Sequence, residues 1–282
     1  MFLFFDNLSF LVVQYLLIRQ NVMLAIFYLG VFVFGILWGS FLGAWIYRLH
    51  AHKPVVMARS MCPYCGHVLG AFDLIPLFGF LFLKGRCRYC KKKISWEYFF
   101  LELATGLLFA LFTYSLLGVD IGMLDWGIFL DLLYYWFIVV MMLFFFVYDF
   151  KHYLILDKVI LPVTGILLIW RLVLGISFWN MLLGAFLASG FFLFQYLVSK
   201  GRWIGGGDIR MGGLMGVILG FPDVLAALFI AYLGGALVSL LLMGCGFKTW
   251  GSKIPFATFL TSAVLVTLLW GDRLLEFYFS FF

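Results

Sequence analysis

The chain has 282 residues, of which 66% are hydrophobic and 11% are charged, and its formal net charge is +6. Soluble globular domains carry about 25% charged residues, so this composition, with a mean hydropathy of +1.13, excludes that class. We expect an all-α polytopic membrane protein that contacts lipid and binds no nucleic acid. Asp6 interrupts the usual basic start and no small-residue cleavage site follows, so we expect no removable signal peptide.

Eight apolar stretches approach the length of about 20 residues that crosses a bilayer. They cover residues 24–47, 98–117, 127–148, 158–176, 180–198, 208–220, 223–246 and 255–270. We expect residues 1–23 to form an apolar interfacial segment, residues 24–47 the first membrane helix, residues 48–97 a small loop domain, and residues 98–282 a core of seven membrane helices.

The basic residues predict the orientation, because Lys and Arg concentrate in cytoplasmic loops. If the loop domain is cytoplasmic, so are the turns at 149–158, 199–210 and 247–254. Together these segments hold sixteen of the nineteen Lys and Arg residues. The scheme requires residues 208–220 to cross the membrane as a short helix, because a re-entrant loop there would invert the two spans that follow.

The loop domain contains two Cys-x-x-Cys pairs, Cys62 with Cys65 and Cys87 with Cys90, separated by 21 residues. Four cysteines in two such knuckles are typical of a structural Zn²⁺ site with tetrahedral coordination. A redox dithiol and unligated thiols are the alternatives. Arg and Lys residues around the second pair balance the charge of a tetrathiolate and are suited to contact anionic headgroups.

Two carboxylates stand at the ends of apolar spans, on the same side of the membrane in this topology. Asp208 follows Gly205-Gly206-Gly207, and Asp149 ends an aromatic run. A charge at membrane depth is unfavourable unless it faces a partner or a wet cavity, so the pair is a candidate acid–base site. The alternative is that each Asp is a solvated charge where its helix leaves the bilayer. The glycines before Asp208 would permit positive φ angles and a close approach of another chain.

In order and spacing, these motifs resemble those of the bacterial type IV prepilin peptidases. The first span contains Gly39-Ser40-Phe41-Leu42 and runs to Tyr47-Arg48-Leu49 at its exit. The loop domain holds both cysteine pairs, Asp73-Leu74-Ile75-Pro76 and Lys84-Gly85-Arg86. Glu102 follows in the second span. Asp149 with Lys151 resembles the first aspartate motif of the family, and Gly205-Gly206-Gly207-Asp208 matches its second, GxGD.

The resemblance implies an aspartic endopeptidase of the bacterial inner membrane that removes the basic leader of type IV prepilins and pseudopilins at the cytoplasmic face. Asp149 and Asp208 are then catalytic. Gly205, Gly207, Lys151 and Glu102 support the substrate or the site, and Cys62, Cys65, Cys87 and Cys90 bind zinc. It also implies N-methylation of the new N-terminus with S-adenosylmethionine, and the loop domain is the candidate region because archaeal relatives that only cleave lack it.

Two other functions fit parts of the pattern. A presenilin-like or signal-peptide-peptidase-like intramembrane protease also uses a GxGD aspartate, and Tyr148-Asp149 resembles its partner motif. A zinc-binding scaffold for pilus or secretion assembly would need neither aspartate. The site of the cut in the substrate distinguishes the first alternative, and substitution of either Asp distinguishes the second.

Overall fold

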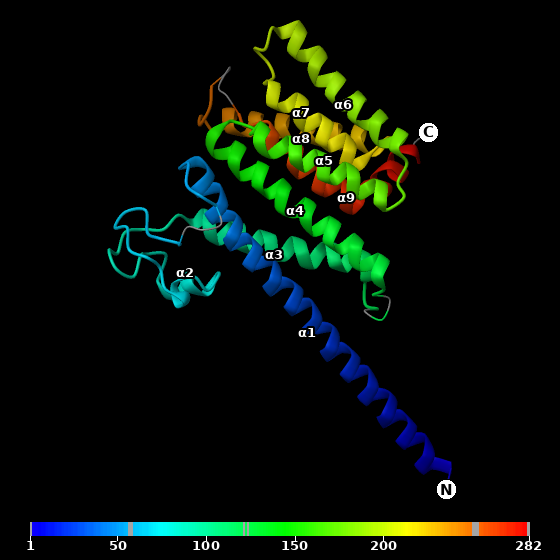
Figure 1. Ribbon diagram of the computed structural model, residues 1–282. Helices are drawn as coiled ribbons and strands as arrows, with labels where there is room; N and C mark the ends of the chain where they lie inside the picture. Colours follow the sequence, from blue (N-terminus) through cyan, green and yellow to red (C-terminus); the bar gives the residue numbers. More distant parts are fainter. Residues whose placement is uncertain (1, 56–58, 121, 123, 250–253, 281–282) are drawn as a thin grey trace. The chain divides into compact units, whose positions relative to one another are not determined.

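The structure is a computed structural model that describes residues 2–55, 59–120, 122, 124–249 and 254–280, with the backbone alone for residues 2–19, 272, 275 and 277–279. Within these residues every long element is an α-helix (Figure 1), which confirms the expected fold class. The longer helices are α1 (Phe2–His50), α3 (Trp96–Leu117), α4 (Trp126–His152), α5 (Asp157–Val173), α6 (Phe178–Ser199), α7 (Gly206–Leu219), α8 (Asp223–Gly244) and α9 (Ala257–Phe279). Lys253, one of the basic residues counted above, lies outside the described residues.

The eight expected spans coincide with these eight helices. Five of the helices, α1, α3, α4, α6 and α8, contain a segment that is long and apolar enough to cross a membrane. The other three are shorter in their apolar part: α5 has 17 residues, α7 has 14, and α9 is apolar over Ala257–Gly271. Residues 2–23 continue into the first span within one helix, and their interfacial role stays a prediction.

The chain divides into two compact units, Met1–Trp136 and Phe137–Phe282. In the first unit, a glycine stripe on α1 brings that helix against α3. A Cβ added at Gly35 would lie 2.8 Å from the Cα of Gly106, and one added at Gly39 would lie 2.7 Å from the Cα of Glu102. Small residues four positions apart allow membrane helices to approach closely. The antiparallel pair holds both ends of the loop domain, which contains η1 (Ala71–Asp73) and α2 (Phe78–Phe82).

In the second unit, α7 packs directly on α6. A Cβ at Gly216 would lie 2.1 Å from the backbone nitrogen of Ala185, so the two backbones touch. The Asn180 side chain donates to the carbonyl of Phe221 (2.7 Å) and accepts from its N–H (3.2 Å). The start of α6 therefore lies at the end of α7, and the two helices are antiparallel.

The short helix α7 is tied to α5 at both ends. Near its start, Arg210 forms an ion pair with Asp157, the first residue of α5. At its end, Arg171 in the last turn of α5 donates to the carbonyls of Val217 (2.8 Å) and Ile218. These carbonyls would otherwise have no partner in the helix. The two helices are thus parallel over their whole lengths, which supports the short crossing rather than a re-entrant loop.

Candidate active site and metal centre

Asp149 lies in the last turns of α4, where its side chain is 6% exposed. The negative end of the α4 dipole disfavours a carboxylate at this position. The first turn of α9 offsets this effect, because the backbone N–H groups of Thr258 and Ala257 donate to the Asp149 carboxylate. Among the described residues, none hydrogen-bonds to its buried Oδ2 atom. One side of this carboxylate is therefore held, and the other is available for chemistry.

Asp208 lies in the first turn of α7 and is half-buried. Its Oδ2 atom accepts the backbone N–H of Gly205 at 3.0 Å, which closes the turn as a capping interaction. Helix N-termini favour negative charge. Both candidate carboxylates are consequently placed against the N-terminus of a helix.

The second unit brings the two carboxylates together although 58 residues separate them in sequence. Asp149 and Asp208 lie close enough for direct electrostatic repulsion. Gly207 permits the approach, because a Cβ there would lie 3.0 Å from the Cβ of Ile155 in the segment that follows α4. Two carboxylates at close range cannot both ionise freely, so they are suited to share one proton.

The three glycines before Asp208 differ from the sequence expectation in one respect. None of Gly205, Gly206 and Gly207 is among the residues with positive φ, and Gly205 is extended at φ −80° and ψ 158°. The left-handed backbone that these glycines would permit is not adopted, because Gly205 is the extended N-cap and Gly206 and Gly207 lie in the first turn of α7. Close approach is confirmed at Gly207. At Gly206 a Cβ would meet nothing within 4 Å, which leaves open space beside Asp208.

The structure adds groups that the motifs did not indicate. Ala257 and Thr258 act through backbone N–H groups, so their side chains give no sequence signal. The available signal was Pro255, which marks the start of the last expected span and therefore the place where free N–H groups occur. Tyr232 on α8 interacts electrostatically with Asp208, and its hydroxyl donates to Oε1 of Gln195 at 2.9 Å. Gln195 is an amide in the interior of an apolar span, which was the signal for this pair.

The remaining predicted residues have distinct places. Lys151 is exposed in the last turn of α4, where a cation is favourable for the helix dipole. Glu102 belongs to the first unit and is 8% exposed. Its carboxylate accepts the Leu77 N–H at 2.7 Å and a hydrogen bond from Ser40. Glu102 therefore fastens the loop domain to α1 and α3, and contact of Lys151 or Glu102 with substrate stays a prediction.

The four cysteines of the loop domain form one cluster. Their sulfur atoms all lie within 4.8 Å of one another, and Sγ of Cys62 lies 3.8 Å from Sγ of Cys90. Tetrahedral coordination with Zn–S bonds of about 2.3 Å requires sulfur atoms about 3.8 Å apart. The donor set and its spacing fit a tetrathiolate metal site.

The two knuckles are built alike. Cys62 N–H donates to His67 at 2.9 Å and Cys87 N–H donates to Lys92 at 2.9 Å, each across a turn with left-handed backbone at Gly66 or Lys91. The tyrosine of each knuckle contacts the other knuckle. Tyr89 packs against His67 in a tilted arrangement with ring centroids 3.6 Å apart, and Lys92 lies 4.7 Å from the centre of the Tyr64 ring.

Hydrogen bonds within the cluster change the ionisation of Cys62 and Cys90. Burial disfavours the Cys62 thiolate, but backbone hydrogen bonds from Cys65 and Tyr64 and side-chain bonds from Cys65 and Cys87 lower its pKa to about 7. For Cys90, the Lys92 N–H favours the thiolate, yet burial and the other three thiols together raise the pKa to about 11. Metal binding at this site must therefore displace protons.

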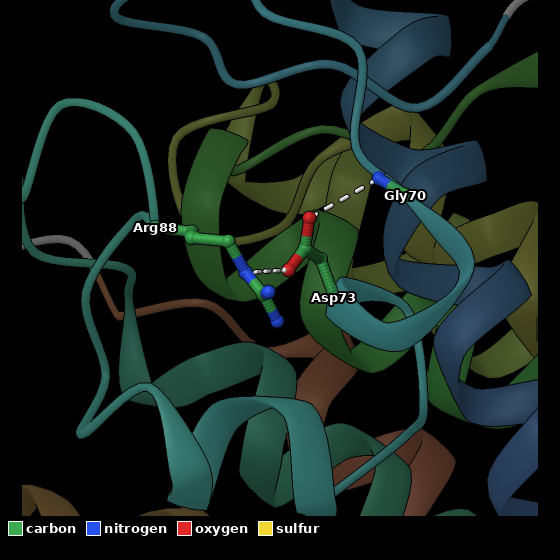
Figure 2. A network of polar contacts seen from close by, with 3 residues as sticks. All are labelled: Gly70, Asp73 and Arg88. Carbon is green, nitrogen blue, oxygen red and sulfur yellow. Dashed lines mark hydrogen bonds and ion pairs between the residues drawn. The ribbon is translucent and has the colours of Figure 1, made fainter.

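An ion pair connects the second knuckle with the segment between the knuckles (Figure 2). Arg88 Nε lies 2.7 Å from Oδ1 of Asp73, whose side chain is almost fully buried, and the Gly70 N–H donates to Oδ2 at 3.1 Å. The backbone of Asp73 packs against Gly79 of α2, where a Cβ would lie 2.8 Å from the Asp73 carbonyl oxygen. The second cysteine knuckle and α2 are thus parts of one folded loop.

The fold and these sites define a polytopic helical membrane protein with a paired-carboxylate site and a Cys₄ loop domain. The sequence-family model described as Type IV leader peptidase family matches residues 136–271. A second family model, described as Bacterial Peptidase A24 N-terminal domain, matches residues 33–116. The chain belongs to the type IV leader peptidase family.

Curated relatives match over most of the chain. A protein of Bacillus subtilis named prepilin leader peptidase/N-methyltransferase is 31% identical, over 88% of this chain and 96% of the relative. A protein of the same name from Stutzerimonas stutzeri is 29% identical, over 90% of this chain and 94% of the relative. A protein of the same name from Myxococcus xanthus is 32% identical, over 77% of this chain and 64% of the relative. No solved structure matches the chain.

Proposed function

We propose that this protein is a membrane aspartic endopeptidase that cleaves the leader of type IV prepilins or pseudopilins, with Asp149 and Asp208 as catalytic residues. The observation that carries the proposal is that these two carboxylates interact electrostatically, and that each accepts backbone N–H donation at a helix N-terminus. Family membership and the names of the relatives support the substrate class.

The pair is suited to acid–base hydrolysis of a peptide bond. One ionised carboxylate removes a proton from water while the water oxygen attacks the scissile carbonyl carbon. The protonated partner carboxyl group donates its proton to the carbonyl oxygen. The proton then passes to the leaving amine as the C–N bond breaks. The open space beside Gly206 gives room for an extended substrate backbone next to Asp208.

We also propose that the protein methylates the new N-terminal amine with S-adenosylmethionine, and that the Cys₄ cluster binds a structural Zn²⁺. The names of the relatives support the transferase activity, and the tetrahedral spacing of the thiols supports zinc. When bound, zinc would hold the two knuckles together as a structural ion. The four thiolates would be its ligands. Because a closed tetrathiolate shell has no open position for catalysis, the ion would have a structural role.

The carboxylate end of the second unit faces the cytoplasm of a bacterial inner membrane in this proposal. The sixteen-to-three division of basic residues supports the orientation. In a chain whose own cysteines are replaced by serine, Lys200→Cys should be protected from a membrane-impermeant thiol reagent in intact cells, and Asp120→Cys should react. Labelling at position 200 alone would reverse the orientation.

The direct test is incubation of the purified protein with a prepilin and S-adenosylmethionine, followed by mass measurement of the product. The proposal predicts loss of the leader and a further gain of one methyl group. A cut within the apolar helix of the substrate would instead indicate an intramembrane protease. An unchanged prepilin mass would support the scaffold function.

A further inference from the structure

An apolar patch covers α2 and the segment that precedes it. Phe82 is 82% exposed and Phe72 is 78% exposed, and between them lie four more exposed apolar side chains, Leu74, Ile75, Phe78 and Leu81. Such a concentration of exposed apolar side chains in one short segment normally marks contact with a partner or a membrane.

The hydrogen bond between Leu77 and Glu102 fixes the level of this patch relative to α3. Leu77 immediately precedes α2, and its N–H donates to Oε2 of Glu102 at 2.7 Å. Glu102 lies six residues beyond Trp96, the first residue of α3, which is about 9 Å along the helix axis. Since α3 is a candidate membrane span, α2 lies beside the first turns of the span rather than beyond its end.

Ring contacts determine which side of α2 faces outward. Phe80 packs between two residues of α3, with its ring centroid 4.8 Å from that of Trp96 and 5.6 Å from that of Phe99. Phe78 and Phe82 are exposed on the same short helix. Their apolar rings therefore project away from α3, at the level where that helix enters the membrane.

The neighbouring side chains are those of a membrane interface. Trp96 and Phe100 are exposed in the first turns of α3, and aromatic residues concentrate where a span meets the headgroups. Residues 48–97 contain nine Lys and Arg residues but two acidic ones, and Asp73 is already paired with Arg88. Exposed basic residues follow α2 directly and include Lys84, Arg86, Lys91, Lys92 and Lys93.

We infer that α2 and residues 72–77 lie within the interfacial layer of the lipid bilayer, with their apolar side chains among the acyl chains and the following basic residues on anionic headgroups. The Cys₄ domain is then held against the membrane on a third anchor besides α1 and α3. The inference uses contacts of the first unit alone and does not depend on the proposed enzyme activity. Short apolar segments with basic flanks bind bilayers in this manner.

The test uses the full-length protein in vesicles of equal parts phosphatidylcholine and phosphatidylglycerol. The photoreactive amino acid p-benzoylphenylalanine replaces Phe82, and illumination is followed by intact-protein mass measurement of lipid adducts. Leu107, an exposed residue further along the candidate membrane span α3, gives the reference, and Tyr64, an exposed aromatic residue of the first knuckle, gives the matched control. Each replacement is at an exposed position, so the fold is retained.

The inference predicts an adduct yield at position 82 comparable with that at 107 and several-fold above that at 64. The adducts at 82 should also contain more phosphatidylglycerol than those at 107. Absence of adducts at 82, or equal yields at 82 and 64, would overturn the inference. Crosslinks from position 82 to a second copy of the chain, or replacement of lipid adducts by prepilin adducts when prepilin is added, would assign the patch to a protein partner and overturn it as well.

Discussion

The carboxylate site and the Cys₄ site are assembled in opposite ways. The cysteines are arranged by local turns, since each knuckle closes with hydrogen bonds between residues five positions apart. Helix packing brings Asp149 and Asp208 within electrostatic range of each other, and the N–H groups that hold Asp149 belong to α9, more than a hundred residues away. The Cys₄ site therefore depends on the loop sequence, whereas the carboxylate site depends on the positions of α4, α7 and α9.

The largest expected effect separates the two activities. Asp208→Asn keeps the size of the side chain but removes its acid–base function, so cleavage should fall by at least about 10³-fold. Methyl transfer requires a neutral amine aligned with the sulfonium methyl and no carboxylate pair, so a pilin that is already cleaved should still be methylated. The measurement is transfer of labelled methyl from S-adenosylmethionine. Equal loss of both activities, with normal thermal stability, would show a single shared site.

Removal of two metal ligands should have the next largest effect. Cys62→Ser with Cys87→Ser leaves one thiol in each knuckle, so bound zinc should fall from one per chain to a negligible amount. Acidification should release zinc from the unaltered protein, because protons compete for the thiolates, and raising the pH should restore binding. Zinc analysis after gel filtration measures both. Full occupancy in the double variant would exclude this site, and Cys245→Ser is the control that should retain zinc.

A smaller effect is expected from the backbone groups that hold Asp149. Ala257→Pro removes one N–H at the first position of α9, where proline is compatible with a helix. Loss of a charge-assisted hydrogen bond should lower the cleavage rate about tenfold or more. Ala257→Gly, which retains the N–H, is the control and should cleave at nearly the normal rate. A normal rate for the proline variant at unchanged thermal stability would contradict the role of α9.

The smallest effects concern the equivalent turns of the two knuckles. Gly66 and Lys91 both have positive φ, a conformation that disfavours residues other than glycine by about 1–2 kcal/mol. Gly66→Ala should therefore weaken the loop domain by about 1 kcal/mol or more. Lys91→Gly should leave it unchanged or slightly more stable. Zinc release in a denaturant titration compares them, and the reverse order would show that the turns are not equivalent.

The sequence predicts the Cys₄ site more fully than the carboxylate site, because the first is assembled locally and the second by distant helices. The Cys-x-x-Cys spacing predicts the thiol cluster because the ligands and the turns that orient them are adjacent in the chain. The basic loops predict a common side for Asp149 and Asp208 but not their electrostatic interaction, which the close packing of Gly207 on Ile155 permits. Ala257 and Thr258 contribute only backbone groups, so no residue pattern marks them.

The helices show a similar division. Hydrophobic length predicts the positions of all eight long helices, yet the 14-residue α7 is explained only by side chains from its neighbours. Arg171 satisfies its terminal carbonyls, and Arg210 ties its start to Asp157. Arg171 falls within the expected span 158–176, outside the basic segments, and charge counting gives no reason for its presence. Interactions between distant helices thus account for what the sequence pattern did not contain.

The most direct test of the central claim compares three carboxylates at the same end of the second unit. Purified Asp149→Asn, Asp208→Asn and Asp157→Asn proteins are incubated with a prepilin, and leader loss is measured by mass over time. Asp157 is exposed and pairs with Arg210, so its variant should cleave at nearly the normal rate. The other two should be slower by at least about 10³-fold. Normal cleavage by either the Asp149 or the Asp208 variant would contradict the paired-carboxylate mechanism.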